Sequence, residues 1–254
     1  MALLEVKNLS ISFGGLRAVD GFNLKIEKGM LYGLIGPNGA GKTTVFNLLT
    51  GVYKPNEGIV TLDGKDITGK SIIEINKAGI ARTFQNIRLF KDLSVLDNVK
   101  AGLHNNNAYS TIEGIFRLPK YRRVEKEMNQ KAMEILKVFD LAGEAEILAS
   151  NLPYGKQRKL EIARAIATEP KLLLLDEPAS PLDPLMRDKL CNMLREYLDE
   201  GNGEKSVFFS THNIADMENV TDYCVILEQG QVVEQGFVED LKEKYVLVKG
   251  EPGD

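Results

Sequence analysis

Hydrophobic and polar residues alternate along the first part of the chain, as they do in strands with one buried face. Residues 4–7 and 22–27 follow this alternation. Residues 31–35 are almost entirely apolar, which is typical of a strand covered on both faces. A glycine-rich turn follows, and residues 42–49 then show a helical pattern. Two further strands are predicted, at residues 58–63 and 81–84.

The middle of the chain has a helical pattern, from about residue 94 to residue 168. Residues 122–139 form its clearest helix, because apolar side chains recur on one face. These side chains are Val124, Met128, Ala132, Ile135 and Phe139. The charged residues between positions 120 and 127 are expected on the solvent-exposed face of this helix.

Strands and helices alternate again after residue 168. The predicted strands are residues 171–175, 206–210 and 223–227, and the predicted helices are residues 185–198 and 214–220. Such alternation predicts a parallel sheet with helical crossovers. We therefore expect one α/β domain built from residues 1–87 and 169–254, with the helical residues 88–168 inserted between its halves.

Composition and charge exclude several classes of protein. The 254 residues carry a formal net charge of -4, so the whole chain has no electrostatic footprint for nucleic acid. No apolar run approaches the roughly 20 residues of a membrane helix, and the N-terminus lacks the pattern of a signal peptide. A role at a membrane would therefore need another chain. Cys191 and Cys224 are expected to be reduced thiols, and two histidines exclude a histidine-rich metal site.

Residues 36–43 read GPNGAGKT and match the pattern GxxxxGK[ST] between a predicted strand and a predicted helix. Glycines let backbone N–H groups turn toward an anion without a Cβ in the way. The following helix directs its positive end at the phosphates. Lys42 is placed to reach the β- and γ-phosphates of a nucleotide, and the Thr43 hydroxyl to bind Mg2+. The alternative, a plain glycine turn, is disfavoured by the strand–loop–helix context.

Two acidic residues, Asp176 and Glu177, directly follow the apolar residues 172–175. Asp176 is predicted to hold Mg2+ mostly through water, and Glu177 to polarise an attacking water molecule. Acids at strand ends can also be purely structural. Their combination with the phosphate loop favours the catalytic interpretation.

Residues 151–160 read NLPYGKQRKL and lead into a predicted helix. Here the chain resembles the ABC ATPases, whose signature is LSGGQ followed by a helix, and the resemblance extends from about residue 4 to residue 241. Gln85 matches the glutamine loop of that family, residues 180–183 match its D-loop, and His212 matches its switch histidine. Phe13 matches the aromatic residue that stacks on adenine.

The resemblance implies a P-loop NTPase fold of the ABC-ATPase type. This is an α/β fold with a RecA-like core, an N-terminal antiparallel β subdomain and an inserted α-helical subdomain. It also implies that the chain binds ATP and Mg2+. The residues expected to bind nucleotide are Phe13, Val19, Gly36, Asn38, Gly39, Gly41, Lys42, Thr43, Thr44, Gln85, Tyr154, Gly155 and Lys156. The expected metal-binding residues are Thr43, Gln85 and Asp176, and the expected catalytic residues are Glu177, His212 and Lys42.

Three features make the chain similar to the ATPase subunits of branched-chain amino-acid importers: residues 83–90, which read TFQNIRLF, the long segment 104–123, and the Tyr-Gly form of the signature. This resemblance implies a cytoplasmic protein on the inner face of the cell membrane. Its implied partners are integral-membrane permease subunits, a second ABC ATPase subunit in a homo- or heterodimer, and, indirectly, an extracytoplasmic solute-binding protein. Each ATP in such a dimer is held by one chain's phosphate loop and capped by the other chain's signature.

The signature departs from the family pattern at two positions. Pro153 replaces the usual serine and offers neither a hydroxyl nor an N–H group, so the contact across the dimer must use the Tyr154 and Gly155 amides. Lys156 replaces the usual glutamine, and a cation near a helix N-terminus costs about 0.3–1 kcal/mol. We hypothesise that the partner's ATP γ-phosphate offsets this cost by pairing with Lys156. The alternative is a solvated lysine that contacts nothing.

Rival functions are weighed against this interpretation. One is a regulatory ABC module that binds ATP but scarcely hydrolyses it. Pro153 and Lys156 favour this module, and an intact set of Lys42, Asp176, Glu177 and His212 opposes it. Another is an ABC protein of DNA repair or translation, a class that usually has paired cassettes or long coiled-coil insertions. A third is the ATPase of a transporter for another solute.

Overall fold

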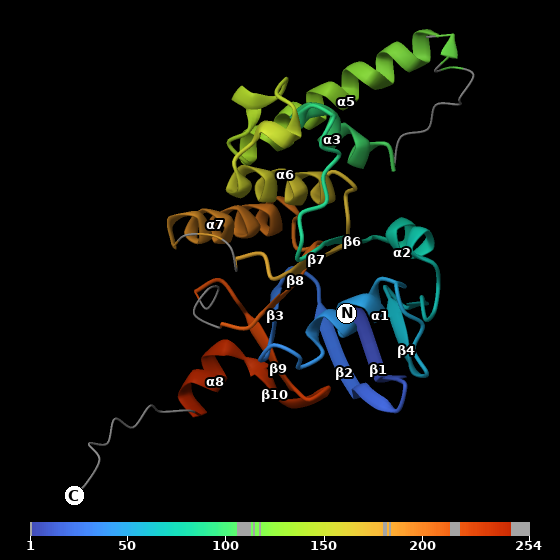
Figure 1. Ribbon diagram of the computed structural model, residues 1–254, viewed down its shortest axis with the longest axis vertical. Coiled ribbons are helices and arrows are strands. Elements are labelled where there is room, and N and C mark those ends of the chain that lie inside the picture. Colours follow the sequence, from blue (N-terminus) through green and yellow to red (C-terminus); the bar gives the residue numbers. More distant parts are fainter. Residues whose placement is uncertain are drawn as a thin grey trace, which may run out of the picture.

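The computed structural model of the protein describes residues 2–105, 113, 115–116, 118–179, 182, 184–213 and 219–244. Figure 1 shows two sheets at one end of the molecule and a group of helices at the other. The strands are β1 (Ala2–Phe13), β2 (Leu16–Glu27), β3 (Leu31–Ile35), β4 (Glu57–Leu62), β5 (Lys65–Asp66), β6 (Ile80–Thr83), β7 (Leu172–Asp176), β8 (Ser206–Thr211), β9 (Tyr223–Glu228) and β10 (Gln231–Phe237). The helices are α1 (Lys42–Leu49), α2 (Ile72–Ala78), α3 (Val95–Leu103), α5 (Pro119–Val138), α6 (Tyr154–Ile166), α7 (Pro184–Glu200) and α8 (Val238–Lys244), with the 3-10 turns η1 (Ala142–Glu144) and η2 (Ala149–Asn151).

The N-terminal sheet is antiparallel and has the strand order β2-β1-β4-β5. Its first two strands form a hairpin in which Phe13 pairs with Leu16 across the two-residue loop Gly14-Gly15. Both glycines have positive φ, at 52° and 92°. Two-residue hairpin loops with positive φ at both positions match the right-handed twist of the strands, and glycine adopts them without strain.

The second sheet has the order β10-β9-β3-β8-β7-β6, and all its pairs except β9–β10 are parallel. Its apolar runs are explained by the two cores that it separates. In β7, Leu172 and Leu174 pack with α1 and the N-terminal sheet, whereas Leu173 and Leu175 pack with α6 and α7. Strands with both faces covered need apolar residues at every position.

Helices α3, α5 and α6, here called the helical lobe, lie in the sequence between β6 and β7, which are neighbours in the parallel sheet. Figure 1 shows the lobe at one end of the molecule, with α7 between it and the sheet. On α5, Met128 and Ala132 are buried and Val124 and Ile135 are partly buried, so the predicted stripe is confirmed. Leu136 extends this stripe.

The pattern of hydrophobic residues predicted the strands and helices of the nucleotide-binding half well. It missed α2, β10 and α8, which are short or half-exposed. The predicted helix at residues 214–220 lies mostly outside the described residues, as does most of the D-loop. Within the described part of the chain, no helix combines the length and apolar character needed to cross a membrane.

Candidate active site

The loop between β3 and α1 closes around the side chain of Lys42. The Lys42 ammonium donates hydrogen bonds to the carbonyl oxygens of Gly36, at 2.7 Å, and Pro37, at 3.1 Å. A Cβ on Gly36 would lie 2.3 Å from the Leu227 carbonyl oxygen, so only glycine lets β9 pack against the loop. Gly41 precedes α1 with φ at 105°, in the left-handed region that favours glycine. The sequence therefore shapes a loop that opens at the N-terminus of α1.

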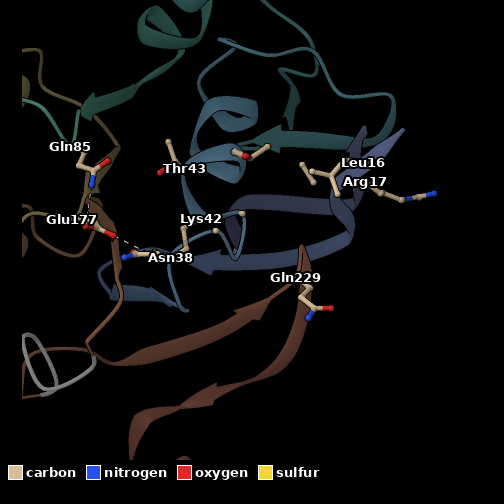
Figure 2. Close-up of a pocket in the computed structure, with 12 residues that line it drawn as sticks. Leu16, Arg17, Asn38, Lys42, Thr43, Gln85, Glu177 and Gln229 are labelled. Atoms are coloured by element: carbon tan, nitrogen blue, oxygen red, sulfur yellow. Dashed lines mark hydrogen bonds and ion pairs between the residues drawn. The ribbon is translucent and has the colours of Figure 1, made fainter. Parts of the chain in front are cut away.

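A pocket of about 740 Å³ lies over this loop. Figure 2 shows Lys42, Gln85 and Glu177 toward one end of it, and Leu16, Arg17 and Gln229 toward the other. Its lining residues are Leu16, Arg17, Ala18, Asn38, Gly39, Gly41, Lys42, Thr43, Thr44, Gln85, Glu177 and Gln229. The N-terminus of α1 faces this pocket and has no side-chain cap, so its first N–H groups are available to an anion.

The strand-end acids Asp176 and Glu177 occupy different environments. Asp176 is 1% exposed, and Glu177 lines the pocket with an unusual backbone φ of 46°. Ser210 holds both residues in place: its hydroxyl donates to Asp176 Oδ1 at 2.8 Å and accepts from the Glu177 N–H at 3.0 Å. A non-glycine residue with positive φ persists only where its surroundings fix it, and this serine is part of that constraint.

Three of the predicted site residues converge on the Glu177 carboxylate. Oε1 lies 3.8 Å from Lys42 Nζ and 3.5 Å from His212 Nδ1. Oε2 accepts a long hydrogen bond of 3.5 Å from Gln85 Nε2. Burial lowers the pKa of Lys42, an effect that the carboxylates of Glu177 and Asp176 oppose. The Glu177 carboxylate therefore lies beside Lys42, Gln85 and His212 at the edge of the pocket over the phosphate loop.

Asp176 is held by a buried arginine that the sequence analysis did not single out. Arg82, on β6, donates from Nη2 to Asp176 Oδ2 at 2.7 Å, and from Nη1 to Asn47 Oδ1 on α1 at 2.6 Å. Burial lowers the pKa of Arg82, and the hydrogen bond to Asp176 opposes this shift. Because both carboxylate oxygens of Asp176 already accept hydrogen bonds, this residue fits a metal contact through bridging water.

The predicted signature residues lie on a separate part of the molecule and do not line the described pocket. Tyr154, Gly155 and Lys156 form the first turn of α6, after Pro153, which provides no side-chain cap. Tyr154 is 50% exposed. Lys156 forms an ion pair with Glu144, so the expectation of a lysine that contacts nothing is wrong.

Besides the signature residues, three predicted nucleotide contacts are absent from the pocket lining: Phe13, Val19 and Gly36, whose carbonyl oxygen instead accepts a hydrogen bond from Lys42. Val19 is fully buried in the core shared with β1 and α1. Strand alternation turns its side chain inward, and nucleotide binding by Val19 stays a prediction. Phe13 is 43% exposed, and its ring packs edge-on against Tyr53 at 5.1 Å, beside the hairpin that carries Leu16. Adenine stacking by Phe13 stays a prediction.

Sequence reasoning also missed residues that line or support the site. Leu16, Arg17 and Ala18 line the pocket directly after the Gly14-Gly15 turn, and their position just after the predicted adenine contact was an available signal. Gln229 reaches the pocket from the β9–β10 turn, and no local pattern marks it. Ser210 lies near the end of β8, the strand that precedes His212, which was a second unused signal.

Comparisons with known proteins agree with this geometry. Residues 19–180 match the family model described as ABC transporter. The chain is 39% identical over 252 residues to the high-affinity branched-chain amino acid transport ATP-binding protein BraF of Pseudomonas aeruginosa, covering 99% of this chain and 98% of BraF.

Solved structures of similar fold include two ATP-binding cassettes. The ADP conformation of MJ1267, an ATP-binding cassette of an ABC transporter, has a TM-score of 0.82 and 32% identity, with 96% of this chain and 94% of that chain covered. A dimeric post-hydrolysis state of the cassette MJ0796, bound to ADP and Pi, has a TM-score of 0.77 and 26% identity, with 92% and 98% covered. The chain therefore belongs to the ABC transporter family and is one of its ATP-hydrolysing subunits.

Proposed function

We propose that this chain powers the import of branched-chain amino acids by hydrolysing ATP beneath separate membrane subunits. The observation that carries the proposal is the convergence of Lys42, Gln85 and His212 on the Glu177 carboxylate, at the rim of the pocket over the phosphate loop. A loop that binds phosphates would by itself allow nucleotide binding without hydrolysis. A carboxylate fixed beside that loop adds the group needed to orient an attacking water molecule.

The chain's own residues divide the work of phosphoryl transfer. The loop amides, the α1 N-terminus and Lys42 bind the phosphates and stabilise the charge that spreads over the γ-phosphoryl group. Glu177 aligns the attacking water, and His212 lies on the same side of the site, 3.5 Å from Glu177. Gln85 bridges from the segment after β6 to Glu177.

Mg2+ fits the oxygen donors at the pocket. Thr43 and Gln85 line the pocket and offer a hydroxyl and an amide oxygen to the ion. Asp176 directly precedes Glu177, which also lines the pocket, so its carboxylate is placed to contact the ion through water. Hard oxygen donors and retained water are what Mg2+ prefers in nucleotide sites. When bound, the ion neutralises charge on the β- and γ-phosphates.

We further propose a head-to-tail dimer in which the α6 N-terminus of one chain caps the ATP held by the other. The separation of Tyr154, Gly155 and Lys156 from this chain's own pocket supports the idea, because an uncapped helix start offers its N–H groups to an anion held elsewhere. MJ0796 is a precedent for a dimer of ATP-binding cassettes. The proposed arrangement applies equally to a second copy of this chain and to a different ABC ATPase subunit.

The membrane subunits have a candidate contact where the helical lobe meets the sheet. A pocket of about 300 Å³ lies there, and its lining includes Asn76, Phe90 and Arg164. Phe90 is 52% exposed, and the Arg164 guanidinium lies over its ring at 5.2 Å. We propose that this groove receives a short helix of a permease, which would hold the chain at the inner face of the membrane.

The amino-acid substrate rests on the relatives. The match to BraF covers 99% of this chain and 98% of BraF, so the similarity includes the helical lobe that would face the permease. Uptake of labelled leucine, isoleucine and valine by cells lacking this chain tests the substrate. We expect uptake to return with the wild-type chain and not with Glu177→Gln. Normal uptake of all three amino acids without the chain would contradict the proposal.

A simpler measurement distinguishes the proposed ATPase from a regulatory module that binds ATP but scarcely hydrolyses it. Purified chain should release phosphate from Mg-ATP in a steady state, and Arg195→Gln, far from the phosphate loop, serves as a matched control that retains turnover. Saturable ATP binding without phosphate release, alone and with the membrane subunits, would favour the regulatory module.

A further inference from the structure

Arg158 is the bulkiest fully buried side chain among the described residues. It lies on the second turn of α6, about 6 Å along the helix axis from Tyr154. Its Nη1 donates to Glu161 Oε2 at 2.7 Å, one turn further along the same helix. Both side chains are almost completely buried, with 1% and 2% exposure. Burying two charges is costly unless hydrogen bonds to other groups help to satisfy them. The other hydrogen bonds of this pair therefore show which segments it holds in place.

The pair grips both ends of the segment that carries Gln85. Arg158 Nη1 donates to the Phe84 carbonyl oxygen at 2.5 Å, immediately before Gln85. Glu161 Oε1 accepts from the Arg88 N–H at 3.1 Å, three residues after Gln85. The Arg88 guanidinium in turn lies 4.1 Å from the centre of the Phe84 ring. Gln85 is therefore exposed on a segment whose two ends are both fixed to α6.

The same arginine also reaches the strand that ends in the catalytic acids. Arg158 Nη2 donates to the backbone carbonyl oxygen of Asp176 at 2.7 Å, and Glu177 follows directly in its strained backbone conformation. A planar guanidinium can hold two carbonyl groups and a carboxylate at fixed angles, which a single ammonium cannot.

We infer that the Arg158–Glu161 ion pair is a positioning unit that sets the separation of Gln85 and Glu177 and fixes both to the signature helix. The inference rests on the proposed function, because it assigns Glu177 and Gln85 to ATP hydrolysis. Neither member of the pair lines the nucleotide pocket, so its effect is on turnover and not on binding. In the proposed dimer, the helix that caps one ATP would also fix the hydrolytic residues that serve the other ATP.

The test compares Arg158→Met and Glu161→Met with the variant that carries both changes. Each single change leaves a buried charge without its partner and should lower the Tm. The double variant removes both charges and should recover part of that loss, although the Phe84 and Asp176 carbonyl groups and the Arg88 N–H stay without these partners. Its kcat should nevertheless stay about 10-fold or more below wild type, because small misplacement of reacting groups can cost up to about 100-fold. Its Kd for Mg-ATP should stay within about 3-fold of wild type, since Lys42 and the phosphate loop are unchanged.

Two further variants sharpen the result. Glu161→Gln keeps an acceptor for the Arg88 N–H and should retain most of the turnover. Arg195→Met breaks a more exposed arginine–carboxylate pair, with Asp222 at 2.8 Å, and neither residue lines the nucleotide pocket; it should lower the Tm less than the single changes in the buried pair, with kcat unchanged. A double Met variant whose kcat recovers together with its Tm would overturn the inference, as would a parallel loss of ATP binding. Wild-type protein without ATPase activity, both alone and with the membrane subunits, would instead reject the proposed function.

Discussion

Helices α1 and α6 both begin without a side-chain cap, but the surroundings of their first turns differ. The loop before α1 surrounds its start with glycine backbone, and the Lys42 side chain is 6% exposed and folded onto two carbonyl groups. The α6 start follows Pro153 without a cap, and the Lys156 side chain is 40% exposed and paired with Glu144. We call the α1 start the finished site, because its own loop surrounds it. We call the α6 start the unfinished site, because it is open and meets a second surface only in the proposed dimer.

The difference shows why a single chain of this family can bind nucleotide but is not expected to hydrolyse it efficiently alone. The α1 site depends on local sequence, since its loop, lysine and helix are consecutive. In the proposed dimer, the α6 site is completed by a surface of the second chain. Changes at the two helix starts should therefore affect different measurements.

The largest effect is expected from Glu177→Gln, which removes the carboxylate beside the finished site. General bases contribute about 100- to 10,000-fold to a rate, so phosphate release should fall by about 1,000-fold. Titration with Mg-ATP should still show binding, and size-exclusion chromatography with light scattering should show an ATP-dependent dimer. Turnover at the wild-type rate would remove Glu177 from its proposed role.

Lys42→Ala should break the finished site itself. Hydrogen bonds to charged groups contribute about 1.5–3 kcal/mol, so calorimetry should show Mg-ATP binding weakened by about 10- to 100-fold. The loss should be smaller for ADP, which lacks the γ-phosphate. Equal affinity of wild type and variant for ATP would show that Lys42 does not contact the nucleotide.

Pro153→Ser should help complete the unfinished site. A serine N-cap is worth about 1 kcal/mol over alanine, and its hydroxyl can also approach a phosphate. In the Glu177→Gln background we expect the Kd of the ATP-dependent dimer to tighten about 3- to 10-fold, as measured by analytical ultracentrifugation. Pro153→Ala is the matched control, because it removes the proline without adding a hydroxyl. Equal gains for serine and alanine would assign the effect to the backbone.

The smallest effect is expected from Lys156→Gln. If Lys156 leaves Glu144 for the partner's γ-phosphate, the variant should show a weaker salt dependence of ATP-driven dimerisation. Glu144→Gln should have the opposite effect, since it frees the ammonium. An unchanged salt slope in Lys156→Gln would show that Lys156 remains with Glu144 throughout.

The sequence revealed the finished site more fully than the network behind it. Residues 36–44 and 172–177 could be interpreted from local patterns, because strand, loop and helix follow one another there. Arg158 was visible only as a letter of the signature, and its contact with Phe84 spans 74 positions. Arg82 and Asp176 are 94 positions apart. Such pairings depend on how strands align in the sheet, and no periodicity encodes that alignment. Val19 is the converse case: its predicted role followed from family position, whereas strand alternation turns its side chain into the core.

The Ala18 carbonyl oxygen lies close to two glycines, Gly41 of the phosphate loop and Gly230 of the β9–β10 turn. A Cβ on Gly41 would lie 2.8 Å from the Ala18 oxygen, and a Cβ on Gly230 would lie 2.7 Å from the same atom. The phosphate loop, the β9–β10 turn and the N-terminal hairpin thus meet at a point where even a methyl group would intrude. Backbone hydrogen bonds join the same three segments, from the Asp20 N–H to the Gly230 oxygen and from the Gly230 N–H to the Ala40 oxygen, both at 2.9 Å, so the hairpin and the phosphate loop are held to one turn.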